Sequence, residues 1–349
     1  MEISYTPTLD SAETARRLER LLVPGALRDP ALLRSIDRLA EDFRSYAGAY
    51  PLPLWAPGLV LTPEMRSLTE ALFPLKRVSA VFERVLRRGC RFAPLLEGTY
   101  LRGSASWLDL LQRFRPQLPR ANPAAILAQL AEDQEQRTRF LFALLLPHHF
   151  GGSFDRYPEQ SRWLAGWLQD NAGRLAGRVR ALDSACGSGE GTYGLAEQIA
   201  AAGYRGAGCR VHGSTLELIE LFAGAHAFFP HDPERQMVYR NRVAPLLAGK
   251  ETMELKFYLD DLGTTHGGEK YDVILCNGLL GGPLMHEPAQ LSAAMEALAS
   301  RLLPGGVLLA ADRFHAGWRQ QVAPEELRAL LRESGLTPLE IGEGVAGRR

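Results

Sequence analysis

A short run of small residues between an apolar segment and a helical pattern is the feature of this chain best suited to chemistry. The run Ser184-Ala-Cys-Gly-Ser-Gly-Glu190 follows the apolar segment 179–183 and precedes the helical pattern of 192–202. Such a loop presents backbone N–H groups at a helix N-terminus, where an anionic or polar ligand can approach the main chain. A Cβ at Gly187 or Gly189 would hold that ligand away or exclude the required backbone angles. We therefore expect a ligand site around this loop.

The order of small residues in the loop resembles the first motif of class I S-adenosylmethionine-dependent methyltransferases. The pattern D-x-x-C-G-x-G runs here from Asp183 to Gly189. A dinucleotide-binding loop would have the spacing G-x-G-x-x-G, whereas the small residues of this loop stand at every second position. The resemblance implies S-adenosylmethionine as cofactor and S-adenosylhomocysteine as product. The residues that it assigns to cofactor binding are Asp183, Ala185, Cys186, Gly187, Gly189 and Glu190.

The next predicted strand, 209–213, leads to the position at which nucleotide-binding α/β folds place an acid for the ribose hydroxyls. Thr215 occupies this position, and Glu217 stands two residues further on. Because a hydroxyl group binds a ribose more weakly than a carboxylate does, Glu217 is the alternative ribose ligand. Thr215 can equally serve as a helix N-cap. Both interpretations stay open on the sequence alone.

Two later predicted strands end in further candidate ligands. Asp261, which we prefer to Asp260, could accept a hydrogen bond from an adenine amino group, and the backbone of Leu262 could bond a ring nitrogen. Asp261 could also be only a solvated loop acid. Asn277 and Gly278 follow the second of these strands and would face the reactive end of the donor.

From about residue 178 onward, apolar runs of strand length alternate with segments of helical periodicity. The predicted strands are 179–183, 209–213, 255–259, 271–276 and 306–310, with a weaker one at 338–341. The predicted helices are 192–202, 216–225, 288–302 and 324–334. Strands joined by helical crossovers form a parallel sheet, and ligands bind beyond the carboxyl ends of its strands. We predict an α/β fold with a Rossmann-like, mainly parallel sheet.

The first 145 residues show helical periodicity interrupted by proline-bearing loops, without a convincing strand alternation. The predicted helices are 14–22, 30–47, 63–71, 77–88, 104–113 and 124–146. We therefore predict two domains, an all-helical N-terminal domain at 1–147 and a methyltransferase domain at 148–349. A length of 349 residues agrees with this division.

The composition is that of an ordinary globular protein. Hydrophobic residues make up 46% of the chain and charged residues 23%, and the formal net charge is zero. This balance gives no reason to expect a nucleic acid or an anionic membrane as a partner. The sequence shows neither a signal peptide nor an apolar run long enough to cross a bilayer. The four cysteines show no C-x-x-C pair, and we expect a cytoplasmic protein.

A finer resemblance is to the CheR-type chemotaxis receptor glutamate methyltransferases. Their first motif C-S-T-G-E-E-P-Y-S-L-A is similar to the segment 186–196, and their D-x-I-x-C-R-N is similar to Asp272-Val-Ile-Leu-Cys-Asn-Gly278. Their N-x-T-x-F-F-R-x-P segment matches 150–158 at Phe154, Arg156 and Pro158. Their asparagine-leucine adenine contact falls on Asp261 and Leu262, their ribose aspartate on Thr215, and their second motif acid on Gly191.

The resemblance implies an in-line methyl transfer to a protein glutamate, in which positioning does most of the work. A glutamate, with a pKa of about 4.3, is already ionised at neutral pH and needs no base. Arg156 could hold a carboxylate of the acceptor or donor, and Tyr193 could add a hydroxyl contact. An amine or alcohol acceptor would need a base, for which the candidates are His286, Asp312 and His315.

Three functions thus remain open: a methyltransferase acting on a protein carboxylate, a small-molecule methyltransferase with a helical lid, and a non-catalytic binding or signalling module. No metal is expected, since His148 and His149 have no third ligand at metal spacing. Arg84, Arg87 and Arg88, followed by Arg91, form a basic helical face. That face is either solvated or a docking surface for an acidic protein partner.

Overall fold

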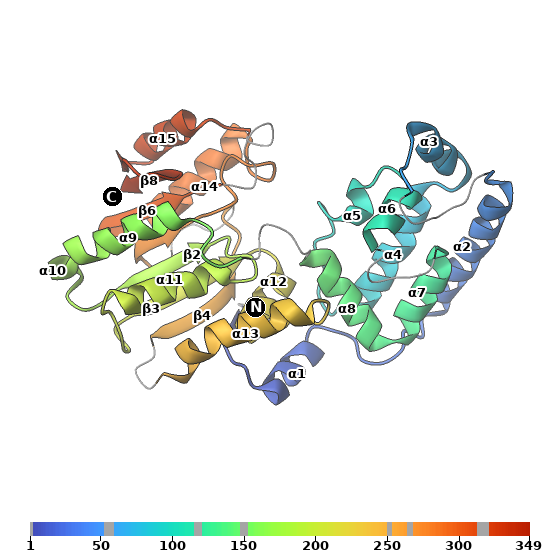
Figure 1. Cartoon of the computed structure of the whole chain (residues 1–349), viewed down its shortest axis with the longest axis horizontal. Helices are drawn as coiled ribbons and strands as arrows, with labels where there is room; N and C mark the ends of the chain where they lie inside the picture. The colour runs from blue at the N-terminus through green and yellow to red at the C-terminus, as the bar shows by residue number, and fades with distance from the viewer. Residues whose placement is uncertain are drawn as a thin grey trace. The chain divides into compact units, whose positions relative to one another are not determined.

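The computed structural model describes residues 3–51, 59–114, 121–146, 153–249, 253–263, 268–312 and 321–349. The chain divides into two compact units. One unit consists of Asp10–Pro147 with Phe229–Pro233, and the other consists of Met1–Leu9, His148–Phe228 and Glu234–Arg349. The first unit is helical and the second contains the sheet (Figure 1).

The helices of the first unit begin mainly at side-chain caps. They are α1 (Ser11–Glu19), α2 (Pro30–Ala49), α3 (Pro63–Leu72), α4 (Leu75–Gly89), α5 (Tyr100–Gly103), α6 (Trp107–Phe114), α7 (Pro123–Glu132) and α8 (Gln134–Leu145). Asp29, Thr62 and Asn122 each accept a hydrogen bond from a backbone N–H of the first helical turn that follows, with proline at the first helical position. Phe82 of α4 stacks on Trp107 and Phe140, which joins three helices in the core.

The single helix predicted for 124–146 is wrong, because the chain breaks at Asp133. The Asp133 carboxylate accepts hydrogen bonds from the N–H groups of Glu135 at 2.8 Å and Gln136 at 3.1 Å, so it caps α8. The apolar periodicity continues across the break, which explains why the sequence pattern did not show it.

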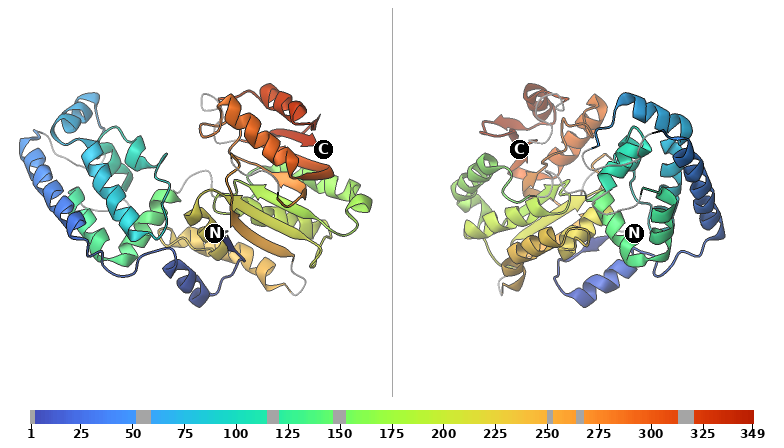
Figure 2. Two further views of the ribbon diagram at one scale, coloured as in Figure 1. Left: turned by 180° about the vertical axis from the view of Figure 1, so that it is seen from behind. Right: turned by 45° about the vertical axis from the view of Figure 1, so that its right-hand side comes forward.

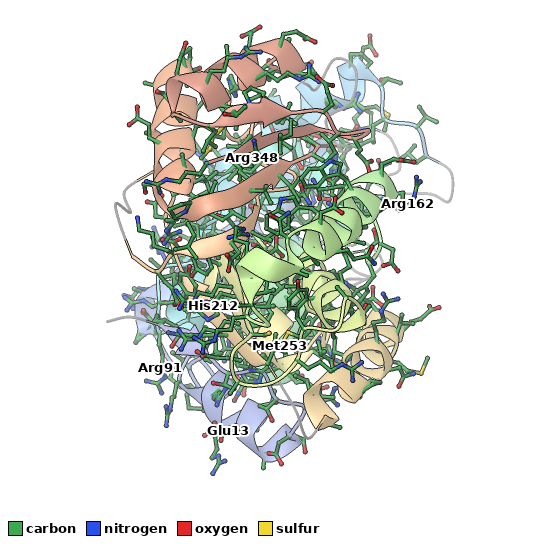
Figure 3. All side chains as sticks on the ribbon, turned by 90° about the vertical axis from the view of Figure 1, so that its left-hand side faces the viewer. Glu13, Arg91, Arg162, His212, Met253 and Arg348 are labelled. Carbon is green, nitrogen blue, oxygen red and sulfur yellow. The ribbon has the colours of Figure 1, made fainter. Side chains whose placement is uncertain are left out.

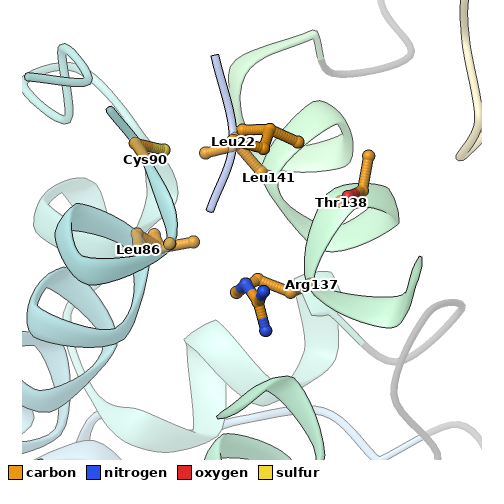
Figure 4. Close-up of a pocket in the computed structure, with 7 residues that line it drawn as sticks. Leu22, Leu86, Cys90, Arg137, Thr138 and Leu141 are labelled. Atoms are coloured by element: carbon orange, nitrogen blue, oxygen red, sulfur yellow. The ribbon is translucent and has the colours of Figure 1, made fainter. Parts of the chain in front are cut away.

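Arg137 is a buried arginine that ties the helical unit together through backbone carbonyls. Its guanidinium donates to the carbonyls of Leu130 and Ala131 at the end of α7, and to those of Val23 and Gly25 in the segment after α1. It lines a small pocket with Leu22, Leu86, Gly89, Cys90, Thr138 and Leu141 (Figure 4). Because its donors are occupied by these carbonyls, we interpret Arg137 as a structural clamp.

The second unit contains an eight-stranded sheet in the order β1-β4-β3-β2-β5-β6-β8-β7. The strands are β1 (Ser4–Tyr5), β2 (Arg180–Ser184), β3 (Arg210–Thr215), β4 (Glu254–Leu259), β5 (Tyr271–Leu275), β6 (Leu302–Ala310), β7 (Thr337–Leu339) and β8 (Val345–Arg348). The strands β2 to β6 are parallel, whereas β1, β7 and β8 pair in an antiparallel manner. The predicted mainly parallel, Rossmann-like α/β fold is confirmed.

Helices cover both faces of this sheet. They are α9 (Pro158–Asp170), α10 (Ala172–Leu175), α11 (Glu190–Ala201), α12 (Leu218–His226), α13 (Pro233–Ala248), α14 (Pro288–Ser300) and α15 (Pro324–Glu333). Figures 1 and 2 show α9 and α11 along one face and α14 along the other. The row Leu182, Ile274 and Leu308 packs with residues of α14 and α15 in one buried cluster, as alternating strand residues require.

A group of polar residues lies on the central strands β3 and β5 and at the start of β4. His212 of β3, labelled in Figure 3, is buried with its Nδ1 3.1 Å from the hydroxyl of Tyr271. Its ring nitrogens lie 3.8 Å from Glu254 and 3.6 Å from Glu269. Burial lowers the pKa of His212 despite these carboxylates. The histidine therefore belongs to the packing of the sheet.

Candidate functional site

The glycine-containing loop lies at the centre of the sheet, where β2 pairs with β3 on one side and β5 on the other. This reversal of strand order is the place at which open α/β sheets bind ligands. The Cys186 N–H donates to the Ser214 carbonyl at 2.8 Å, which joins the loop to the end of β3. Ala185, Gly187 and Gly189 have φ values of +61°, +54° and +88°. Ala185 is thus a non-glycine residue in the left-handed region.

The two glycines of the loop have different surroundings. An added Cβ at Gly187 would meet no heavy atom of the described residues within 4 Å, so that side of the loop is open. An added Cβ at Gly189 would lie 2.7 Å from Cε1 of Phe257, so the other side is closed. Gly189 is also the N-cap of α11. The loop therefore has a packed back and an open front beside a helix N-terminus, as an anion cradle requires.

Helix α13 holds the back of the loop, and the sequence analysis did not identify this helix. Tyr239 donates to the carbonyl of Ser188 at 2.6 Å. Arg235 donates to the Ser188 hydroxyl at 2.7 Å and to Glu190 at 2.6 Å, and the Ser188 hydroxyl donates to the other Glu190 oxygen at 2.7 Å. The Glu190 side chain is only 4% exposed. Glu190, expected to bind the cofactor directly, therefore positions the loop.

Asp183, the residue before the last one of β2, is buried. Its Oδ2 accepts a hydrogen bond from the Thr192 hydroxyl at 2.8 Å and lies 2.7 Å from the place of a Cβ at Gly191. Burial raises the pKa of Asp183 to about 7, and the Thr192 hydrogen bond and the charge of Arg156 oppose this rise. A side chain at position 191 would collide with Asp183, which explains why glycine stands there.

The end of β3 places three side chains differently from the sequence expectation. Thr215 is not the N-cap of α12, because Glu217 takes that position and accepts from the Ile219 N–H at 3.3 Å. The Thr215 oxygen accepts from the Glu217 N–H at 3.3 Å, and its hydroxyl donates to Glu220 at 2.9 Å. Glu220, the third residue of α12, is the acid that the sequence analysis missed. The sequence feature that could have identified Glu220 is an acidic residue in the first turn of the helix after β3.

The two neighbouring aspartates after β4 lie in different environments. Asp260 accepts a 2.6 Å hydrogen bond from Arg301, and both side chains are almost fully buried. Asp261 is half-buried, and its carboxylate accepts from the Gly263 N–H at 2.9 Å. Leu262 is buried against the core. Asp260 is thus committed to an internal ion pair, and Asp261 remains the better candidate for a ligand contact.

Asn277 connects the ends of β5 and β6 to α9. Its amide exchanges two hydrogen bonds with Gln160, at 2.8 and 3.1 Å, and its Oδ1 also accepts from the Ala311 N–H at 2.8 Å. Gly278, with a φ of +77°, donates its N–H to the Ala311 carbonyl. The Asn277 amide is therefore used to position three elements, and its expected contact with the donor stays a prediction.

The two expected catalytic residues lie in different environments. Tyr193 is 1% exposed and donates its hydroxyl to the Gly224 carbonyl at 3.0 Å, so its place in the core does not support a contact with the acceptor. The charge of Arg156 acts on the buried Asp183. A contact of Arg156 with a ligand, like its role in catalysis, stays a prediction.

The basic face of α4 is partly used inside the helical unit. Arg84 donates to the Ser35 hydroxyl at 2.6 Å, and Arg88 pairs with Asp29 at 2.9 Å. These contacts join α4 to α2, and they give no support to an acidic protein partner. Arg87 is exposed on the same helix.

Two further expectations concern metals and membranes. Among the residues that the structure describes, no group of three metal-binding side chains occurs, and His148, His149 and His315 lie outside those residues. None of the described helices is long and apolar enough to cross a membrane.

The site therefore combines an open glycine-containing loop, a helix N-terminus, and carboxyl groups at the ends of β2, β3 and β4. The Cys186 and Gly189 N–H groups are bonded to the carbonyls of Ser214 and Cys186. The other N–H groups of the loop can bind an anionic group, while carboxylates can accept hydrogen bonds from hydroxyl or amino groups. This arrangement fits a ligand that carries both kinds of group, as an amino acid joined to a nucleoside does.

No protein-family model matches the chain, and no curated protein matches it either. Among solved structures, the magnesium protoporphyrin IX methyltransferase ChlM of Synechocystis PCC 6803 is similar, with 21% identity, a TM-score of 0.36, and coverage of 54% of this chain and 82% of that one. The N-methyltransferase NodS of Bradyrhizobium japonicum is similar at 16% identity, with a TM-score of 0.36 and coverage of 64% and 96%. The amino pentose methyltransferase CalS10 of Micromonospora echinaspora is similar at 18% identity, with a TM-score of 0.34 and coverage of 58% and 100%. At these distances, the function of this chain has to be inferred from its own residues.

Proposed function

We propose that this chain is an S-adenosylmethionine-dependent methyltransferase whose donor site lies at the carboxyl ends of β2, β3 and β4. The observation that carries the proposal is the open front of the loop at Gly187, where no described atom occupies the space that a Cβ would fill. The loop follows β2, whose last two residues are Asp183 and Ser184, and it precedes the N-terminus of α11. The residues present therefore fit a donor with a carboxylate at one end and a nucleoside at the other.

The donor would contact four parts of this edge of the sheet. The backbone from Ala185 to Gly189 would hold its amino-acid end, with Asp183 beneath the loop. Asp261 and the backbone of Leu262 would contact the adenine, and Gly278 would lie toward the reactive end. When bound, the donor supplies a methyl group activated by a sulfonium. The chain's own task is to orient the donor and acceptor in line and to exclude water.

We propose a small molecule, rather than a protein carboxylate, as the acceptor. The charge of Arg156, the residue expected to hold a glutamate acceptor, favours the ionised form of the buried Asp183. Glu190 and Glu220 add two more carboxyl groups near the loop. Since Arg235 pairs with Glu190, Glu220 is the carboxyl group that would repel a carboxylate acceptor, whereas an amine or a hydroxyl would not be repelled. The division into a helical domain at 1–147 and a donor-binding domain at 148–349 is part of the same proposal, with the correction that Met1–Leu9, which contains β1, groups with the sheet.

Incubation with methyl-labelled S-adenosylmethionine and a metabolite extract tests this function. Label should enter a small product that resists mild base, because N-methyl and ether products do not hydrolyse as carboxyl methyl esters do. Release of labelled methanol from a protein fraction would instead support the glutamate methyltransferase. Binding of S-adenosylhomocysteine without any transfer would support the non-catalytic module.

A further inference from the structure

We propose that Glu220, in the first turn of α12, is the carboxylate that binds the ribose hydroxyls of the donor in place of Thr215. This inference rests on the proposed function, since it concerns the same donor site. It assigns the ribose contact to a residue five positions beyond the one that the sequence pattern indicates.

The Thr215 hydroxyl is committed on both sides. Its oxygen accepts from the Glu217 N–H at 3.3 Å, and its proton is donated to Oε2 of Glu220 at 2.9 Å. Thr215 is buried. It therefore has no proton to offer a ribose, and its role is to anchor the Glu220 side chain.

The Glu220 carboxylate has binding capacity left. Within the part of the chain that the structure describes, Thr215 is its hydrogen-bond partner, at Oε2, and the residue is half-buried. A carboxylate has two oxygens and about four acceptor positions. Oε1 is thus available for a hydroxyl group of a ligand, and a ribose offers two adjacent hydroxyls.

The charges around Glu220 place it beside the loop. Burial raises the pKa of Glu220 to about 7; the Thr215 hydrogen bond and the charge of Arg235 oppose this rise, and the charge of Glu190 adds to it. Burial also raises the pKa of the Cys186 thiol in the loop, and the charges of Asp183 and Glu220 add to that rise. Arg235 is hydrogen-bonded to Glu190 rather than to Glu220. Position three of a helix favours a negative charge. The half-buried Glu220 carboxyl has no ion pair among the residues that the structure describes, and partial burial of such a charge costs stability. Such a group is a candidate for ligand binding.

The other acid near β3 has a helix-capping role. Glu217 caps α12 by accepting the Ile219 N–H at 3.3 Å. Its helix cap and the bond from its N–H to Thr215 fix the start of α12, and this start sets where Glu220 lies. The sequence pattern and the structure therefore point to different acids.

Isothermal titration with S-adenosylhomocysteine and with its 2′-deoxy and 3′-deoxy analogues tests the inference at pH 8. Glu220→Gln should lower the affinity for S-adenosylhomocysteine roughly 10- to 100-fold, which is the effect of losing a hydrogen bond to a charged group. The analogue that lacks the contacted hydroxyl should bind wild type and variant within about threefold. Glu296→Gln, an exposed acid on α14, is the matched control and should bind like wild type.

The outcomes separate the inference from the proposed function. Wild type that binds S-adenosylhomocysteine, with Glu220→Gln and Glu220→Asp binding equally well, overturns the ribose assignment and leaves the function standing. Wild type that binds neither S-adenosylhomocysteine nor S-adenosylmethionine overturns the function itself. Glu220→Asp keeps the charge and is the second variant if Glu220→Gln does not fold. It should lower the affinity for S-adenosylhomocysteine and leave the affinity for the deoxy analogue unchanged.

Discussion

Arg235 of α13 and Glu190 of α11 form a buried ion pair at 2.6 Å directly behind the glycine-containing loop. Their side chains are 11% and 4% exposed. Together with the Ser188 hydroxyl, which both contact, they fasten one helix to the N-terminus of another. The loop shape therefore depends on a residue 45 positions away along the chain.

Arg235→Met should destabilise the fold by about 3 kcal/mol, because it leaves Glu190 buried without its partner. The variant should also have a lower affinity for S-adenosylhomocysteine, since the loop loses its contacts with Arg235. Chemical denaturation and titration calorimetry measure the two effects. The double variant Arg235→Met/Glu190→Gln should recover part of the stability, and Arg328→Met on α15 should change neither quantity. A single variant as stable as wild type would show that the pair does not hold the loop.

The buried Asp183 should make stability fall as pH rises. Its pKa in the folded chain is about 7, against about 3.9 when unfolded. Between these values the folded state binds more protons, so the free energy of unfolding decreases with rising pH. The free energy of unfolding of Asp183→Asn minus that of wild type should therefore be about 3 kcal/mol higher at pH 8 than at pH 5. Urea denaturation at both pH values measures this difference, and a pH-independent difference would contradict it.

The two loop glycines should respond differently to alanine. Gly189→Ala should lower stability by about 2 kcal/mol, because its Cβ would lie 2.7 Å from the Phe257 ring and its φ is +88°. Gly187→Ala should cost about 1 kcal/mol for its φ of +54°, but it should weaken S-adenosylhomocysteine at least tenfold. Melting temperatures and titrations of both variants measure this. Equal ligand affinity in wild type and Gly187→Ala would mean that the open front is not the donor cradle.

Arg137 should matter for stability and not for the donor. Arg137→Met removes the donors for four backbone carbonyls and should cost about 3 kcal/mol. Because Arg137 lies in the helical unit, the affinity for S-adenosylhomocysteine should stay unchanged at a temperature where the variant is folded. A loss of affinity in a folded variant would contradict the structural role.

The parallel core of the sheet could be predicted because short strand-like segments alternate with segments of helical periodicity. β2, β3, β4 and β5 each lie within one or two residues of the expected range. β8 was missed because Val345-Ala-Gly-Arg348 carries little strand signal and is fixed by pairing with β6 and β7. α13 was missed because it is polar and contains Pro245. These elements depend on tertiary contacts that a local pattern does not contain.

For the candidate site, the positions of the loop and strand ends could be predicted, but the partners of their side chains could not. The loop and the strand ends follow from spacing, since carboxyl ends of parallel strands meet at one edge. The partners of those residues did not follow: Thr192 for Asp183, Gln160 for Asn277, and Arg301 for Asp260. Glu220 was missed because its position depends on where α12 begins. Which polar side chain remains available for a ligand is decided by such partners.

Titration of the wild-type chain with S-adenosylhomocysteine at pH 8 tests the central claim most directly. We expect saturable binding to one site per chain, with a dissociation constant of about 1–100 μM, and an increase in melting temperature when the ligand is present. Neither heat of binding nor a change in melting temperature at millimolar ligand would contradict the account of the loop around Gly187 as a methyl-donor site.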